Sequence, residues 1–160
     1  MLIPLKQFIC DTCGEIIEKP EDGYVEWVYS DDGMQTQFNI IHHGGSSPRK
    51  KYNHDGCYQH ANRNGRMDEP LNHCLDPNRM MAFLLRFIDM GRYHDPSGKY
   101  IAKVNISEYV ELVRRLTIPY YEEAKVYWNE AISDGYFDGD NEINIYTVYF
   151  LKGIIDKYSK

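Results

Sequence analysis

The stretch Cys10-Asp11-Thr12-Cys13-Gly14 places two cysteines two residues apart and follows them with a glycine. Two intervening residues let both thiolates point at one ion, and glycine relieves backbone crowding so that amides can turn toward the sulfurs. A redox pair with this spacing normally opens a helix after a strand. Here Pro4 precedes the pair and the turn Glu21-Asp22-Gly23 follows it. The stretch therefore predicts half of a zinc site, in preference to a redox pair or two unrelated thiols.

A tetrahedral site needs two more ligands. We predict Cys57 as the third, because thiolates dominate structural zinc sites. The fourth is a histidine, and we favour His43, which lies with His42 at the end of a predicted strand beside the flexible pair Gly44-Gly45. Only one of these two neighbours can face the knuckle, because side chains alternate along a strand. His42 and His60 are the alternates, and Cys57 with His60 forms the C-x-x-H pair of a regular zinc ribbon. A Cys3His site leaves no open coordination position, which predicts a structural zinc.

The cysteines and histidines are concentrated in one half of the chain. All four cysteines and five of the six histidines lie in the first 74 of the 160 residues. His73 and Cys74 are further candidate ligands, with Cys74 expected to be the spare thiol. No apolar run of about 18 residues predicts a membrane span, and residues 1–9 are too short for a signal peptide. We therefore expect a cytoplasmic chain with reduced thiols.

The pattern around the knuckle predicts β-structure. Val25, Trp27 and Tyr29 alternate as in a half-buried strand, and residues 35–41 are predicted as its partner across the turn Asp31-Asp32-Gly33. Residues 54–72 carry little pattern. These observations predict a small, zinc-stabilised, β-rich N-terminal module over residues 1–75.

Helical patterns begin at Asp76-Pro77, a good N-cap followed by proline at the first helical position. Apolar stripes predict about four helices, over residues 77–90, 105–116, 119–133 and 144–158. Residues 92–94 and 99–104 are predicted as a short hairpin. The chain is thus predicted to be an α+β protein, with a helical bundle over residues 76–160 that can form one compact unit with the first module.

The net charge of −6 is unevenly distributed. Residues 1–41 carry −6, residues 42–66 carry +4, residues 67–104 balance, and residues 105–160 carry −4. The acidic total disfavours general nucleic-acid binding. Within the basic segment, Arg49-Lys50-Lys51 is the one place predicted to contact phosphates or an acidic partner.

Tyrosines are frequent in the predicted helices, and this residue type is enriched at protein interfaces. They raise the hypothesis of a partner-protein or homo-oligomer surface, although such residues also commonly lie at the edge of a core. They are Tyr120, Tyr121, Tyr127, Tyr146, Tyr149 and Tyr158.

The order of the knuckle, Ile41-His42-His43-Gly44-Gly45, Asn53 and the Cys57-x-x-His60 pair resembles that of zinc-knuckle HNH endonucleases. The resemblance implies a metal-dependent nuclease, with His42 or His43 as general base and His60 as a ligand of the catalytic metal. However, Asn62-Arg63-Asn64-Gly65 has turn character where those enzymes have a helix. Phosphate-binding loops, dinucleotide fingerprints and nucleophile elbows are not found. We therefore favour a non-enzymatic binding or regulatory protein with a structural zinc, and keep the nuclease as the alternative.

Overall fold

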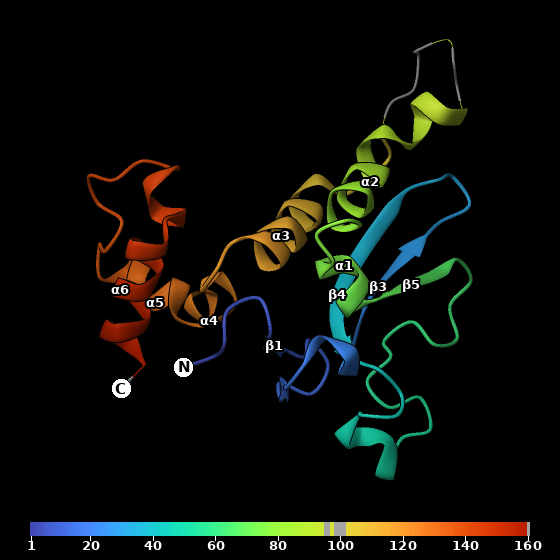
Figure 1. The fold of residues 1–160 in the computed structure, drawn as a ribbon, viewed down its shortest axis with the longest axis horizontal. Coiled ribbons are helices and arrows are strands. Elements are labelled where there is room, and N and C mark those ends of the chain that lie inside the picture. Colours follow the sequence, from blue (N-terminus) through green and yellow to red (C-terminus); the bar gives the residue numbers. More distant parts are fainter. Residues whose placement is uncertain (95–96, 98–101, 160) are drawn as a thin grey trace.

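The computed structural model describes residues 1–94, 97 and 102–159, and it is a mixed α+β fold (Figure 1). Two small antiparallel sheets occupy the N-terminal part of the chain. The strands are β1 (Phe8–Ile9), β2 (Ile16–Ile17), β3 (Gly23–Tyr29), β4 (Gln35–His42) and β5 (Arg66–Pro70). The helices are α1 (Leu71–Leu75), α2 (Met80–His94), α3 (Ile106–Thr117), α4 (Tyr121–Ala124), α5 (Trp128–Ser133) and α6 (Val148–Tyr158). No helix in the described part of the chain is long and apolar enough to cross a membrane.

The larger sheet has the strand order β4-β3-β5, with both pairings antiparallel. The predicted β3–β4 hairpin is confirmed, and Gly33 at its turn has a φ of 84°, a conformation that favours glycine. Strand β5 lies in the segment where the sequence predicted little structure. Its first residue, Arg66, is held by the fully buried carboxylate of Glu26 on β3, at 3.3 Å from Nε to Oε2.

Strand β4 contains an irregularity that changes its register. Glu26 pairs with Asn39, but Val28 pairs with Thr36, so β4 holds one extra residue between these pairs. Gln37 lies at this bulge with a φ of 58°. A bulge moves every following side chain by one step relative to the partner strand, so the faces of the last residues of β4 cannot be counted from its first ones.

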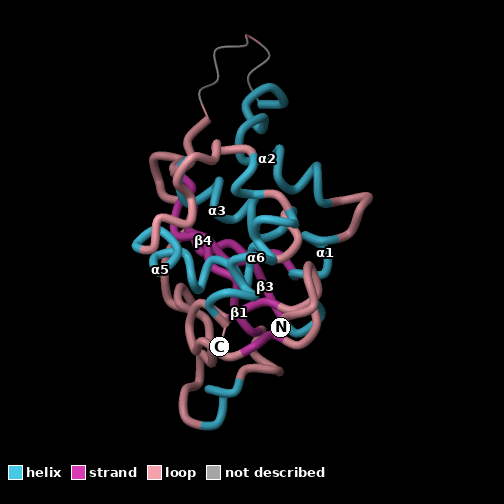
Figure 2. The backbone as a smooth tube through the Cα atoms, turned by 90° about the vertical axis from the view of Figure 1, so that its left-hand side faces the viewer, coloured by secondary structure: helices cyan, strands magenta, loops and turns pink. Residues whose placement is uncertain are grey.

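The first core lies between the large sheet and the helices α2 and α3, which lie side by side in two perpendicular views (Figures 1 and 2). It is centred on Trp27, which is fully buried. The Trp27 ring meets Phe87 edge-on at 5.3 Å and Phe38 in a stack at 6.2 Å. Helix α3 begins at a capped end, because the Asn105 side chain accepts a hydrogen bond from the amide of Glu108. Helix α2 continues through residues 92–94, so the hairpin predicted there is wrong over those residues, and residues 99–101 lie outside the described residues.

The second core is formed by α4, α5 and α6, at the opposite end of the molecule from the large sheet in Figure 1. The single helix predicted over residues 119–133 is instead divided by a 3-10 turn over Lys125–Tyr127. Tyr120, directly before α4, has a left-handed backbone conformation with a φ of 68°. The predicted tyrosine surface is mostly part of this core: Tyr121 is buried, whereas Tyr149 is 90% exposed. The buried residues of the first core lie between Phe8 and Leu116, and those of the second core between Tyr121 and Ile155. The predicted domain boundary at residue 75 stays a prediction.

A buried arginine joins the N-terminal sheet to the second group of helices. Arg115 on α3 is 4% exposed and donates from Nε and Nη2 to the two carboxylate oxygens of Glu122, both at 2.8 Å. Its Nη1 donates to Oδ2 of Asp11 at 2.6 Å, and its Nη2 also donates to the carbonyl of Ile9. Burial alone would lower the pKa of Arg115, but the contacts with Glu122 and Asp11 outweigh burial and raise it. The guanidinium is therefore charged inside the protein, and each of its three nitrogens donates at least one hydrogen bond.

We predict that Arg115→Ala lowers the free energy of unfolding by about 3–5 kcal/mol, because it leaves two carboxylates without their buried cation. Urea unfolding followed by circular dichroism measures the change. Lys19→Ala is the matched control, because the Lys19 amine and Asp22 form an ion pair at 4.0 Å with the lysine side chain 64% exposed. A loss of stability no larger than that of the control would show that Arg115 does not hold the two parts together.

Candidate metal centre

The knuckle residues lie in the turn of the small β1–β2 hairpin. Phe8 pairs with Ile17 and Ile9 with Ile16, so residues 10–15 form a tight loop between the strands. Within it the amide of Cys10 donates to the carbonyl of Glu15, and the amide of Gly14 donates to the carbonyl of Cys10. Gly14 has a φ of 75°, a conformation that costs other residues more. The glycine after the second cysteine is thus required by the backbone of the turn.

Four side chains from three distant segments meet beside this loop. They are Cys10 and Cys13 of the knuckle, His42 at the end of β4, and Cys57 of the following loop, and their ligand atoms all lie within 4.8 Å of one another. Nδ1 of His42 is 3.5 Å from Sγ of Cys13 and 3.9 Å from Sγ of Cys57. In a tetrahedral zinc site, bond lengths of about 2.3 Å to sulfur and 2.0 Å to nitrogen separate S and N by about 3.5 Å. The four atoms are close enough to hold a metal ion.

The hydrogen bond at the far side of the imidazole fixes which nitrogen of His42 is available. Nε2 of His42 lies 3.2 Å from the carbonyl oxygen of Ile16. A carbonyl only accepts, so in the neutral ring Nε2 carries the proton and Nδ1, which faces the sulfurs, keeps its lone pair. Such a partner on the second nitrogen is the usual way in which proteins orient a metal-binding histidine.

Hydrogen bonds connect Cys57 both to the knuckle and to Ser47, near the beginning of the loop that carries Cys57. Oγ1 of Thr12 donates to the carbonyl of Cys57 at 2.6 Å. Oγ of Ser47 lies 3.0 Å from Sγ of Cys57. Gly56 has a φ of 59°, and a Cβ there would lie 2.9 Å from Oγ of Ser47, so glycine permits this close approach. These contacts hold the third sulfur in place from two sides.

Burial and proximity keep the thiols of the cluster protonated unless a cation is bound. Burial raises the pKa of Cys13 to about 12, and the adjacent thiol of Cys10 adds to the effect, while a backbone hydrogen bond at Glu15 opposes it. Burial also raises the pKa of Cys57. Three thiols this close cannot all ionise next to one another unless a positive charge compensates them. A divalent ion supplies that charge, since a coordinating thiol is deprotonated by the metal.

The structure brings His42, and not the favoured His43, to the three cysteines. The His43 ring lies on the other side of the chain, where Nδ1 accepts a hydrogen bond from the amide of Gly45 at 2.8 Å and the ring meets Tyr24 edge-on. His60, the other alternate, is buried beside the middle of β4, with Nε2 3.1 Å from the carbonyl oxygen of Gln37. The expectation that only one of the two neighbouring histidines can face the knuckle agrees with this geometry.

The remaining two candidates lie away from the cluster. Cys74 is fully buried in α1, where burial raises the pKa of its thiol. Nδ1 of His73 lies 3.0 Å from Oε1 of Glu69. Neither belongs to the group of residues close enough to share an ion.

The sequence analysis missed the role of Asp11, which lies between the two cysteines. Its amide donates to the carbonyl of Ile40, and its Oδ2 accepts from the amide of Ile40 at 2.6 Å as well as from Arg115. The carboxylate therefore ties the knuckle to β4, two residues before His42. An acidic residue inside the knuckle was the only local sign of this contact.

Comparisons of the chain with protein-family models, curated proteins and solved structures give no match. The site is therefore interpreted from its own geometry.

We predict that His42→Ala abolishes stoichiometric metal binding, whereas His43→Ala retains it, because only the His42 ring faces the sulfurs. Metal content of the purified proteins, measured by mass spectrometry after gel filtration, checks this. His60→Ala is a further control with a buried histidine outside the cluster. Loss of metal in the His43 variant with retention in the His42 variant would contradict the assignment.

Proposed function

We propose that the chain is a zinc protein in which Cys10, Cys13, His42 and Cys57 hold one structural ion. The meeting of these four ligand atoms within 4.8 Å carries the proposal. Three soft thiolates and one imidazole in a compact set suit zinc better than the oxygen-seeking magnesium or calcium ions. All four cysteines are free thiols, which suits a reducing compartment such as the cytoplasm.

A structural role fits the ligand set better than a catalytic role. Catalytic zinc sites keep a position open for water or substrate, whereas four protein ligands fill the tetrahedron. Cys10 is 1% exposed, Cys57 0% and His42 5%, and only Cys13 is half-buried, so little room remains for a substrate at the ion. The ion would act by linking the knuckle, the end of β4 and the loop before β5.

The geometry gives little support to the nuclease alternative. The ring of His42 is directed at the thiols and that of His43 at the amide of Gly45, so neither is free to act as a general base. Between residues 43 and 65 the described backbone contains a 3-10 helix over Pro48–Lys51 and no α-helix. We therefore propose a non-enzymatic binding protein.

The proposed contact surface is the loop between His42 and Cys57. Both ends of this loop would be fixed, because both residues would bind the zinc. It carries Arg49, Lys50 and Lys51 on a 3-10 helix capped by Ser47, followed by Tyr52, which is 76% exposed. None of these three cations forms an ion pair within the described part of the chain, whereas Arg66 is already bonded to Glu26 and Asp68. Nζ of Lys50 does donate a hydrogen bond to the carbonyl of His54 at 2.7 Å. Three cations are few for a nucleic acid strand, because the affinity for it grows with each phosphate neutralised. We propose an acidic protein segment as the partner.

The zinc proposal predicts that the purified protein contains one zinc per chain and that Cys10→Ser and Cys57→Ser lose it. Chelation should lower the midpoint of thermal unfolding, because the binding free energy of a structural zinc contributes directly to folding. Cys74→Ser is the matched control, since Cys74 is equally buried but lies outside the cluster. A metal-free wild type with an unchanged cooperative melt would refute a structural zinc.

The loop proposal predicts that a fluorescent oligoglutamate peptide binds the zinc-loaded protein, and that Arg49→Ala/Lys50→Ala/Lys51→Ala weakens binding at least about tenfold. Fluorescence anisotropy measures the affinity. Lys19→Ala/Lys152→Ala/Lys157→Ala changes the net charge equally at distant positions and should leave binding unchanged. Tighter binding of a single-stranded oligonucleotide than of the peptide, or equal losses in both triple variants, would overturn the choice of partner.

A further inference from the structure

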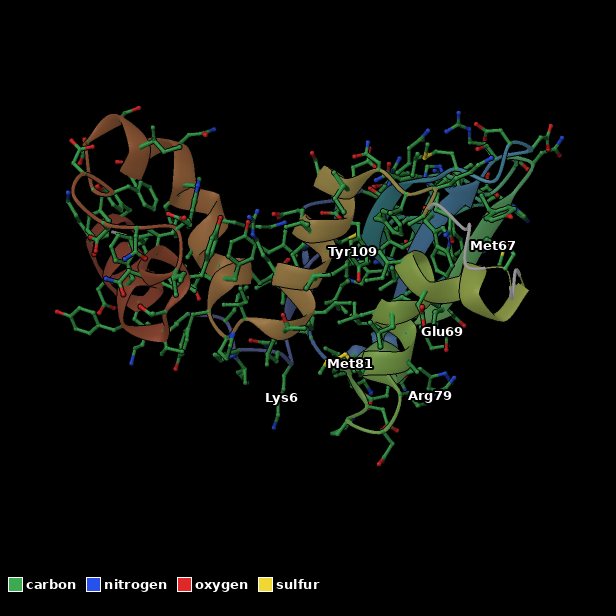
Figure 3. The ribbon with its side chains drawn as sticks, turned by 90° about the horizontal axis from the view of Figure 1, so that it is seen from above. Lys6, Met67, Glu69, Arg79, Met81 and Tyr109 are labelled. Atoms are coloured by element: carbon green, nitrogen blue, oxygen red, sulfur yellow. The ribbon has the colours of Figure 1, made fainter. Side chains whose placement is uncertain are left out.

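A polar cavity lies among β5, α1 and the first part of α2, and none of the cysteine-cluster residues lines it. Its volume is about 290 Å³, and it is lined by Glu69 of β5, His73 of α1, Asn78 and Arg79 before α2, and Ala82, Phe83 and Arg86 of α2. Figure 3 shows Glu69 and Arg79 on the same side of the molecule, beside α1 and the start of α2. The cavity is near the lower end of the size range of small-molecule sites.

Basic groups predominate in this cavity. Among the described residues that line it, Glu69 is the only one with a carboxylate. One oxygen, Oε1, already accepts from Nη2 of Arg79 at 3.1 Å and lies 3.0 Å from Nδ1 of His73. This ion pair compensates the positive charge of Arg79. The second guanidinium, that of Arg86, has no carboxylate beside it in the described part of the chain, so the cavity carries a surplus of positive charge.

The guanidinium of Arg86 is held by aromatic rings. Its central carbon lies 5.2 Å from the centroid of the Trp27 ring and 5.3 Å from that of Phe87. Both rings are fully buried in the first core, so they form a rigid support. An arginine stacked in this way keeps its N–H groups available around the guanidinium plane. It loses little conformational freedom when it donates two parallel hydrogen bonds to an oxyanion.

We propose that this cavity binds a small oxyanion-bearing ligand, whose carboxylate or phosphate group pairs with Arg86. Phe83 supplies an apolar wall, and Asn78 a polar side chain at the rim. Among the described residues the second carboxylate oxygen of Glu69, Oε2, forms no hydrogen bond or ion pair, so it can accept from a hydroxyl or amino group of the same ligand. The cavity shares no lining residue with the proposed zinc site or with the loop between His42 and Cys57.

The test is a titration of the ¹⁵N-labelled, full-length protein with inorganic phosphate and, separately, with citrate, at constant ionic strength with chloride as the reference anion. The indole N–H of Trp27 reports on the cavity, because Arg86 lies on its ring. The only other tryptophan, Trp128, packs in the second core and serves as an internal control. We expect saturable shifts of the Trp27 and Arg86 side-chain signals, with Trp128 unchanged. Saturation by phosphate alone indicates a phosphate ligand, and saturation by citrate alone or by both anions indicates a carboxylate-accepting site.

Arg86→Gln should weaken the binding at least about tenfold. Arg114→Gln is the matched control, because the Arg114 guanidinium lies over the Tyr146 ring at 4.6 Å but does not line the cavity. Dispersed spectra would show that each variant is folded, and second-core signals should be unchanged in the Arg86 variant, whereas the Arg114 variant can shift those near Tyr146 and Trp128. Shifts equal to those with chloride, or equal affinity in the Arg86 variant and the wild type, would overturn the proposal.

Discussion

The meeting of Cys10, Cys13, His42 and Cys57 at one point is the constraint on which the N-terminal half depends. The residues come from a β-hairpin turn, a strand end and a loop, and closing loops of this length costs entropy that grows slowly with the number of residues enclosed. The sheet offsets part of this cost through β3–β4 pairing, but the segment from residue 43 to 65 contributes few buried apolar side chains. An ion at the four ligand atoms would replace the core that this segment lacks, as in other small metal-stabilised modules.

Asp11 extends this constraint to the rest of the molecule. Its carboxylate accepts from the backbone of β4 and from the buried Arg115, and Arg115 in turn holds Glu122 at the start of the second helical group. The pKa of Glu122 shows the balance of forces: burial would raise it, but the hydrogen bonds and charge of Arg115 lower it. Because a buried ion pair is costly unless every group is bonded, this network specifies one arrangement of the knuckle, α3 and α4.

The sequence predicted those parts of the fold whose determinants are local. The C-x-x-C-G spacing identified the knuckle, alternation identified β3 and β4, and the caps at Asn105 and the apolar stripes located the main helices. Strand β5 was missed because Arg66-Met67-Asp68-Glu69-Pro70 is charged and ends in proline. Its Arg66 and Glu69 are compensated by Glu26 and by Arg79, partners that are 40 and 10 residues away. A short window along the chain does not contain the more distant of these pairs, Arg66 with Glu26.

The choice between His42 and His43 shows the same limit at the site itself. A strand with one apolar face would have told the two apart, because alternation would place one histidine with the buried residues. At the end of β4, however, the neighbouring residues Ile40 and Ile41 are both fully buried. The hydrophobic pattern there does not alternate, so it does not show which histidine faces the core. The bulge at Gln37 then removes the possibility of counting from the start of the strand. Only the tertiary contacts decide: the carbonyl of Ile16 orients His42 toward the sulfurs, and the turn at Gly45 holds His43 away from them. Identifying a candidate pair of ligands such as Cys10 and Cys13 thus requires only local spacing, whereas completing the candidate set requires knowing how β4 faces the knuckle.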